Sequence, residues 1–191
     1  MFFLLIVVCL VSSCGHKNSS PVISANGEGT PRLVAVLPVE NETSDARAAL
    51  ILRGKIFEEL YFKGYPKIPF EIIDERLSQI YRDEKGRAAG KIPPVVAGEL
   101  LGVDAVMYCT LTERKTSFVY FYAPTIVSAS FELRSAKTGE TLWKAYHRVI
   151  KRNYGFSRRW LEMKACQVYE TAVDEVVRKS LETLPDGPDS V

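Results

Sequence analysis

The sequence predicts a single α/β domain in which helices sandwich or cover a mixed parallel and antiparallel sheet. Three observations predict it: strand-like and helix-like segments alternate in the first part of the domain, adjacent strand-like segments follow, and a long helical segment comes last. The resulting order, β-α-β-α-α-β-β-β-α, favours either a two-layer or a three-layer sandwich.

The first half of the domain supplies the alternating units. The apolar run Leu33–Pro38 is typical of a strand that is buried on both faces. Helix-capping residues fill Asn41–Asp45, and the apolar positions that follow, as far as about Lys63, fall on the helical period of 3.6 residues. We expect a second strand at Phe70–Ile73 and a short helix from Asp74 through Tyr81.

A polar loop at Asp83–Lys91 leads into the second half. The two prolines before Val95 predict a helix over Val95–Leu101, and Gly102 is placed to end it. Asp104–Thr112 has the composition of a largely buried strand. Glu113–Thr116 is either a polar turn or the point where that strand emerges into solvent.

The last part of the domain is predicted to form a hairpin and a helix that covers the sheet. Polarity alternates along Thr125–Arg134, which is typical of a half-buried antiparallel strand. Ala136–Glu140 predicts a hairpin turn whose glycine adopts a positive φ, and Thr141–Lys151 is the returning strand. We expect a long helix over about Ser157–Leu184.

The first fourteen residues have the pattern of a lipoprotein signal. The apolar run Phe2–Val11 precedes two serines and Cys14, and an apolar core closed by small residues is typical of a secretory signal. The run has about half of the ~20 residues that a membrane-spanning helix needs. A short buried helix or strand of the domain is the alternative. We predict a signal peptide at residues 1–13 and a lipid-modified Cys14, whose thiolate takes the diacylglyceryl group.

Composition divides the rest of the chain. Residues 14–30 are rich in Ser, Asn and Gly, which predicts a flexible lipidated tether. Residues 31–184 form one domain, long enough to bury a core, and residues 185–191 are expected to be a disordered tail. The formal net charge of +2 does not indicate a nucleic-acid partner.

Two cysteines remain in the domain, Cys109 in a predicted strand and Cys166 in a predicted helix. An oxidising periplasm permits a disulfide bridge between them. A buried free thiol that packs as a small hydrophobic group is the favoured state for each.

Catalytic patterns are scarce. No cysteine and histidine cluster has zinc spacing, so we expect neither a metal nor a cofactor. The glycines of Gly86–Lys91 lack the spacing and the Ser/Thr of a phosphate-binding loop. Acidic residues such as Asp74 and Glu75 are better explained by helix capping and solvation than by acid–base catalysis. The sequence therefore predicts a protein that is not an enzyme.

Two segments are candidates for partner binding. The first is aromatic: Phe118, Tyr120, Phe121 and Tyr122 place large side chains on both faces of any strand, so one face needs a protein partner, a membrane interface or a second subunit. A strand covered on both sides within the domain explains the pattern equally well.

The second candidate segment is basic and is interleaved with aromatic residues. It could meet anionic headgroups or peptidoglycan carboxylates, although a solvated turn before a helix is the simpler interpretation. Its cations are Arg148, Lys151, Arg152, Arg158 and Arg159.

Several segments, taken in order, resemble one family. They include LVAVLPVENETSD, LLGVDAVMYCTLT, TIVSASFELR and KTGETLWK. Over nearly all of the mature domain, the chain resembles bacterial outer-membrane lipoproteins of unknown function, typified by a meningococcal surface-antigen lipoprotein. That family domain is similar to the N-terminal domain of TolB and to the periplasmic domains of CsgG and LpoB. These belong to envelope complexes for translocation, secretion and activation of peptidoglycan synthesis.

The resemblance implies a TolB-like fold and an envelope-complex subunit. Together with Cys14, it predicts a periplasm-facing lipoprotein of the outer membrane that acts in a transport or secretion complex. The alternative is a regulator that binds and activates a peptidoglycan-synthesising enzyme. The expected partners are the membrane, through the lipid, envelope proteins and further copies of the chain.

Overall fold

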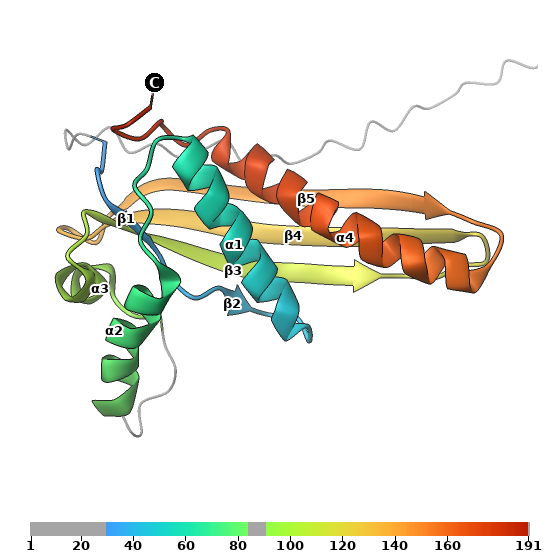
Figure 1. Ribbon diagram of the computed structural model, residues 1–191, viewed down its shortest axis with the longest axis horizontal. Coiled ribbons are helices and arrows are strands. Elements are labelled where there is room, and N and C mark those ends of the chain that lie inside the picture. Colours follow the sequence, from blue (N-terminus) through green and yellow to red (C-terminus); the bar gives the residue numbers. More distant parts are fainter. Residues whose placement is uncertain (1–29, 84–90, 191) are drawn as a thin grey trace, which may run out of the picture.

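The computed structural model describes residues 30–83 and 91–190. The predicted signal peptide, Cys14 and nearly all of the tether lie outside these residues, as does the loop at 84–90. Two short strands precede three consecutive helices, and a meander of long strands and a final helix follow, which differs from the predicted alternation of strands and helices (Figure 1). The elements are β1 Val34–Val36, β2 Glu40–Asn41, α1 Ala46–Phe62, α2 Phe70–Asp83, α3 Pro94–Leu101, β3 Ala105–Thr116, β4 Tyr122–Ser135, β5 Thr141–Tyr154 and α4 Arg158–Leu181.

One five-stranded sheet runs along the whole domain (Figure 1). β1 and β2 both pair with β3 in parallel, whereas β3, β4 and β5 form an antiparallel meander. Parallel pairing needs a crossover, which α1, α2 and α3 supply. The predicted fold class, a mixed sheet covered by helices, is confirmed.

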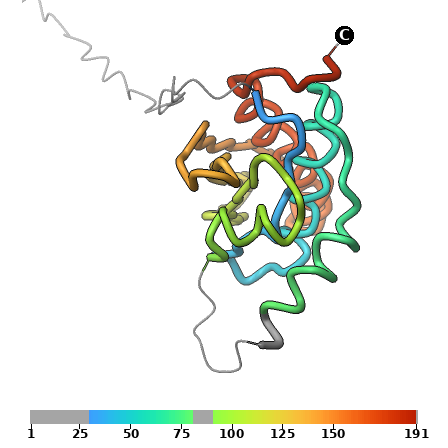
Figure 2. Tube along the Cα trace, turned by 90° about the vertical axis from the view of Figure 1, so that its left-hand side faces the viewer, coloured from blue at the N-terminus to red at the C-terminus, as the bar shows by residue number. Residues whose placement is uncertain are grey.

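Two apolar cores lie on opposite faces of the sheet. Along most of its length, α1 and α4 cover one face, where Phe131 and Trp143 are among the largest fully buried side chains. Among the described residues, the core on the other face lies near β1, where Ile73 of α2 and Ala97 of α3 pack against Ala35. The domain therefore has three layers at the β1 end and two layers beyond it, which combines the two predicted alternatives. Figure 2 looks onto the β1 end.

A buried arginine joins three elements at the β1 end. Arg53 of α1 donates hydrogen bonds to the carbonyl oxygen of Val36, and its guanidinium binds the carboxylate of Asp74 in α2 with two contacts of 2.8 Å. The guanidinium also stacks over the Phe70 ring, with 4.2 Å between its central carbon and the ring centroid. Asp74 thus has a structural role here.

The expected second strand at Phe70–Ile73 is wrong, because these residues form the first turn of α2. A short apolar run does not distinguish a strand from a helix by periodicity alone. The burial of Ile73 and Leu77, four residues apart, shows the helical face that packs on the sheet.

The other predicted elements are confirmed; β3, β4 and β5 are longer than expected, β1 is shorter, and β2 was not predicted. β3 continues to Thr116, so the strand does emerge into solvent after Thr112, past a register shift between Leu111 and Glu113. Asp45 caps α1 by accepting the backbone N–H groups of Arg47 and Ala48. Gly102 and Gly139 have positive φ, as their predicted positions require.

Residues 185–190 differ from the expected disordered tail. The Lys63 ammonium pairs with Asp186 at 2.6 Å, and Gly187 is buried against Gly64. The polar composition predicted disorder, but backbone groups of this segment find partners in the connection between α1 and α2. Its hydrogen bonds run from Tyr65 Oη to Pro185 O, from Gly187 N to Lys63 O and from Asp189 N to Gly64 O.

Both domain cysteines are free, which settles the question of a bridge between them. Cys109 is buried, as expected, and burial raises the pKa of its thiol. Cys166 is exposed on α4, so the interpretation of a second buried thiol is wrong. Within residues 30–83 and 91–190, no helix combines the length and the apolar character that crossing a membrane requires.

Candidate functional site

Two connections meet at the end of the sheet that lies opposite β1 (Figure 1). One joins β3 to β4 and the other joins β5 to α4. They meet because the antiparallel register places Tyr122 opposite Tyr154. We call their exposed apolar side chains the aromatic tip, which consists of Phe118, Val119, Tyr120, Phe121, Tyr154, Phe156 and Trp160.

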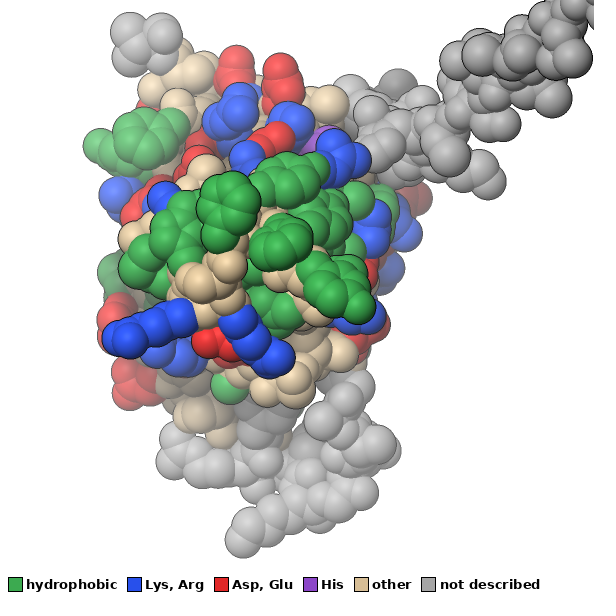
Figure 3. All heavy atoms as spheres, turned by 90° about the vertical axis from the view of Figure 1, so that its right-hand side faces the viewer, with side chains coloured by type: hydrophobic (Ala, Val, Ile, Leu, Met, Phe, Trp, Pro, Cys, Tyr) green, Lys and Arg blue, Asp and Glu red, His purple; other side chains and the backbone are tan. Residues whose placement is uncertain are grey.

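The aromatic tip is the largest group of hydrophobic side chains in the view of Figure 3, which faces this end of the molecule. Tyr120 is 91% exposed, Phe156 is 97% exposed and Phe121 is 61% exposed. Exposed patches of this kind mark sites of interaction with proteins or membranes. The interpretation of a strand covered on both sides is therefore wrong, and Phe118, Tyr120 and Phe121 present an exposed apolar surface.

The β3–β4 connection is a tight hairpin turn. Val119 and Tyr122 exchange two backbone hydrogen bonds of 2.8 Å, which leaves Tyr120 and Phe121 at the apex. Tyr120 has a φ of 47°, in the left-handed region that bulky residues rarely occupy. Strained backbone of this kind is concentrated at functional sites.

The β5–α4 connection packs against this hairpin. The Gly155 N–H donates to the Phe121 carbonyl oxygen at 2.9 Å. A side chain at Gly155 would overlap the Trp160 ring, so glycine is needed for the close approach. Ser157 then caps α4 by accepting the Trp160 N–H at 3.3 Å.

Ring contacts hold the tip together and leave a groove. The rings of Phe121 and Phe156 lie 6.1 Å apart between centroids, and those of Tyr122 and Tyr154 lie 5.1 Å apart. These separations suit tilted aromatic pairs. A groove of about 540 Å³ opens among Phe121, Tyr154, Gly155, Phe156, Ser157 and Trp160.

The predicted basic cluster is divided by the structure. Arg148 pairs with Glu113 of β3 at 2.9 Å, and this hydrogen bond raises the pKa of the guanidinium. Lys151 pairs with Glu175 of α4. Both cations are used within the fold.

The other three predicted cations lie at the tip. Arg158 lies 5.6 Å from the Phe118 ring centroid and pairs with Glu162 at 3.0 Å. Arg152 and Arg159 are exposed and have no ion pair within the described part of the chain. Lys164, which the sequence did not single out, lies 5.4 Å from the centroid of the Trp160 ring.

Glu175 is the residue whose ionisation the fold changes most clearly near these strands. Hydrogen bonds from Lys151 and Lys179 lower the pKa of its carboxyl from 4.5 to about 2. The Lys151–Glu175 pair joins β5, near its C-terminal end, to α4 and holds the helix over the sheet.

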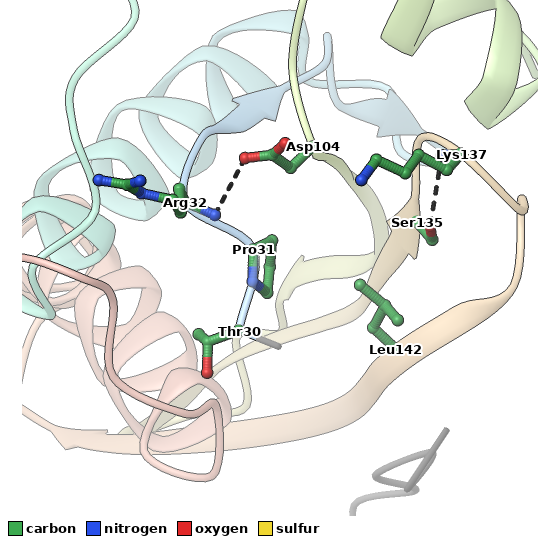
Figure 4. A pocket seen from close by; sticks show the side chains of 7 residues that line it. All are labelled: Thr30, Pro31, Arg32, Asp104, Ser135, Lys137 and Leu142. Carbon is green, nitrogen blue, oxygen red and sulfur yellow. Dashed lines mark hydrogen bonds between the residues drawn. The ribbon is translucent and has the colours of Figure 1, made fainter. Parts of the chain in front are cut away.

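A smaller hollow of about 270 Å³ lies at the opposite end of the sheet, where the described chain begins (Figure 4). The Asp104 carboxylate projects into it and accepts the backbone N–H groups of Arg32 and Leu33 at 3.1 and 3.0 Å. Its charge thus fastens the start of the domain to β3, which gives it a structural role. No group of three or more His, Cys, Asp or Glu side chains that could hold a metal occurs within residues 30–83 and 91–190.

The sequence predicted Phe118, Tyr120, Phe121 and Tyr122 as one segment, and the structure separates them by role. Tyr122 is half-buried as the first residue of β4, whereas the other three are exposed. Phe156 of the second connection and Trp160 in the first turn of α4 were not among the predicted binding residues, although their aromatic character was visible. The missing information was that the two connections converge.

Comparison with known proteins places this fold in a family. The family model described as "Putative lipoprotein GNA1162-like" matches residues 23–184. A curated relative, "Putative lipoprotein NMB1124/NMB1162" of Neisseria meningitidis serogroup B (strain ATCC BAA-335 / MC58), is 29% identical over 118 residues. That alignment covers 61% of this chain and 54% of the relative, so the chain spans about half the length of the curated protein that it matches.

A solved structure shares the architecture. The crystal structure of lipoprotein GNA1162 from Neisseria meningitidis superposes with a TM-score of 0.57 at 24% identity, covering 74% of this chain and 97% of that one. A PelC dodecamer from Paraburkholderia phytofirmans has a TM-score of 0.46 at 15% identity, covering 76% and 84%. Since the family model spans most of the sequence, the chain belongs to the GNA1162-like lipoprotein family.

Proposed function

We propose that this lipoprotein is a non-enzymatic subunit of a transport or secretion complex in the cell envelope, anchored through Cys14 to the outer membrane and facing the periplasm. The exposed aromatic tip carries this proposal. A surface of large aromatic side chains is suited to docking, because each ring buries much area at a small entropic cost.

The remaining polar groups support a docking role over a catalytic one. The most conspicuous charged groups of the described residues serve the fold: Arg53 with Asp74, Glu175 with Lys151, and Asp104 with backbone N–H groups. Within the described part of the chain, no His, Asp, Glu or Lys side chain lines the groove at the tip. In the hollow at the other end, the Asp104 carboxylate and the Ser135 hydroxyl oxygen both accept backbone N–H groups, which are structural contacts.

The anchor is tested by Cys14→Ala. We expect the variant to stay unprocessed or to become soluble, because the acceptor thiol for the lipid is lost. Cell fractionation followed by immunoblotting measures this. A variant that still fractionates with the outer membrane as the wild type does would contradict anchoring at Cys14.

The assembly is tested by formaldehyde cross-linking in cells, followed by purification of the chain and identification of the attached proteins. We expect components of a transport or secretion complex. The double variant Tyr120→Ser/Phe121→Ser should reduce their yield, whereas Phe62→Ser should not, since Phe62 is 79% exposed at the end of α1 and distant from the tip. Recovery of a peptidoglycan synthase instead would support the regulator that the sequence left as the alternative.

A further inference from the structure

We propose that the aromatic tip inserts into the surface of an anionic phospholipid leaflet. The inference rests on the proposed function in one respect, namely that a lipid at Cys14 holds the chain at a membrane. The proposed function gives the tip a docking role without naming the surface that it meets, and this inference names that surface as lipid.

The first argument is the placement of the apolar side chains. Tyr120 lies at the apex of the β3–β4 hairpin and Phe156 lies in the β5–α4 connection beside it, so both project from the end of the sheet. Projecting turns can enter the headgroup region of a bilayer without any matching surface. Tyr and Trp are also the residues enriched at membrane–water interfaces, because their rings are apolar with one polar atom.

The second argument is charge complementarity. The segments 115–122 and 152–164, which carry the tip's side chains, contain five cations but one carboxylate, Glu162. Lysine and arginine can keep their charge at the headgroups while their stems lie along apolar surface. In Figure 3, Lys and Arg side chains flank the hydrophobic patch. Such an arrangement suits anionic headgroups around a shallow apolar insertion.

The third argument is the reach of the chain that precedes the domain. Thr30 lies at the β1 end, and the fourteen residues of β4 span roughly 45 Å between that end and the tip. The sixteen residues from Cys14 to Gly29 reach at most about 55 Å when fully extended. A lipid at Cys14 and the tip can therefore enter the same leaflet, and tilting of the domain shortens the distance that the tether must cover.

The two tryptophans provide the test. Trp160 belongs to the tip, whereas Trp143 is fully buried in the core. The full-length chain, purified from membranes, is reconstituted into vesicles of phosphatidylglycerol and phosphatidylcholine, the latter with brominated acyl chains. We expect the bromine atoms to quench most of the fluorescence of Trp160. This quenching is measured as the difference between the wild type and Trp160→Phe, in which only Trp143 emits.

A matched control places a tryptophan elsewhere on the surface. Phe62→Trp in the Trp160→Phe background should escape quenching, since α1 ends far from the tip. Arg158→Glu/Arg159→Glu should reduce the quenching of Trp160, as should vesicles of phosphatidylcholine alone. Equal quenching at positions 62 and 160, or none at 160, would overturn insertion of the tip. If neither Arg158→Glu/Arg159→Glu nor vesicles of phosphatidylcholine alone reduced the quenching of Trp160, the role of anionic headgroups would be overturned.

The outcomes separate this inference from the proposed function. Cross-linked transport components without quenching of Trp160 would leave the proposed function intact and show that the tip docks to protein. Quenching without any cross-linked partner would support insertion and count against the subunit role.

Discussion

The two ends of the sheet differ in how their apolar side chains are covered. At the β1 end, α2 and α3 close the second face and residues 185–190 pack against the α1–α2 connection. At the other end, β3, β4 and β5 continue past these layers and terminate in exposed aromatic side chains. The same strands thus support a closed core at one end and a bare apolar surface at the other.

This difference separates stability from binding. Burying a large apolar side chain contributes about 1.5–3 kcal/mol to folding, and the closed end gains this contribution at Ile73, Leu77 and their neighbours. The tip leaves the same kind of surface in water, where it is available to a partner. Substitutions at the closed end should therefore unfold the protein, and substitutions at the tip should chiefly change what it binds.

The largest effect is expected from Arg53→Met, which removes the cation that joins α1, β1 and α2. The Val36 carbonyl oxygen would lose its donor in a buried position, and Asp74 would lose its partner. We expect a loss of about 3 kcal/mol in the free energy of unfolding, because an unsatisfied buried acceptor costs about 1–3 kcal/mol and the stacking on Phe70 is lost as well, whereas Asp74, whose side chain is 48% exposed, can be hydrated. Urea denaturation measures it.

Arg47→Met is the control for Arg53→Met, since Arg47 lies on the exposed side of α1. We expect a change within about 0.5 kcal/mol there, as for most surface substitutions. Similar losses in the two variants would show that Arg53 does not hold the three elements together.

Gly187→Ala should cost somewhat less, about 2 kcal/mol, by opening the contact between the C-terminal segment and the α1–α2 connection. A methyl group at this position would overlap the Gly64 carbonyl oxygen, and overpacking of this kind typically costs 1–3 kcal/mol. Gly54→Ala is the control, because a side chain there meets no atom within 4 Å. That variant should gain roughly 0.5–1 kcal/mol, as a helical glycine replaced by alanine does. Loss of stability in both variants would remove the argument for a close backbone contact.

Much of the sheet could be predicted because local patterns determine it. The turn at Ala136–Glu140 brings β4 and β5 together, and after a one-residue register shift between Leu133 and Arg134 the ladder places Tyr122 opposite Tyr154. Convergence of the two tip connections was therefore within reach of the sequence. The division of the basic cluster was not, since Arg148 and Lys151 are paired by residues of β3 and α4 that lie far away in the sequence.

The failures at Phe70–Ile73 and at residues 185–190 share a cause. Each segment is ordered by contacts with distant residues: Ile73 packs on the sheet and Gly187 meets Gly64. Local composition does not reveal contacts with distant residues. The apolar run at Phe70–Ile73 therefore predicted a strand, and the polar composition of residues 185–191 predicted disorder.

Acidification should weaken the attachment of α4 to β5, between the two ends. The carboxyl of Glu175 has a pKa of about 2 in the folded chain and an ordinary value of 4.5. Its ionised form therefore stabilises the fold above pH 4.5, and this contribution is lost as the pH falls toward 2. We expect Glu175→Gln to be less stable than the wild type by about 1 kcal/mol at neutral pH, a figure reduced for solvent screening.

Unfolding curves measured at several pH values check this prediction. The difference between the wild type and Glu175→Gln should shrink between pH 4.5 and about 2. A difference that stays constant across that range would show that the charge on Glu175 does not stabilise the fold.

The smallest effect on stability, and the one that separates the two ends most clearly, is expected at Tyr120. Its left-handed backbone conformation disfavours any side chain, whereas its ring is almost wholly exposed and contributes little packing. Tyr120→Gly should therefore raise the free energy of unfolding by about 0.5 kcal/mol, while Tyr120→Ala, which keeps the strain, should fall about 1 kcal/mol below the glycine variant. Both variants lack the ring and should bind anionic vesicles equally weakly. If Tyr120→Gly were more stable than the wild type and bound anionic vesicles equally well, the Tyr120 ring would have no role in binding. If it is more stable but binds less, the tip has been shaped by its partner at the expense of the fold.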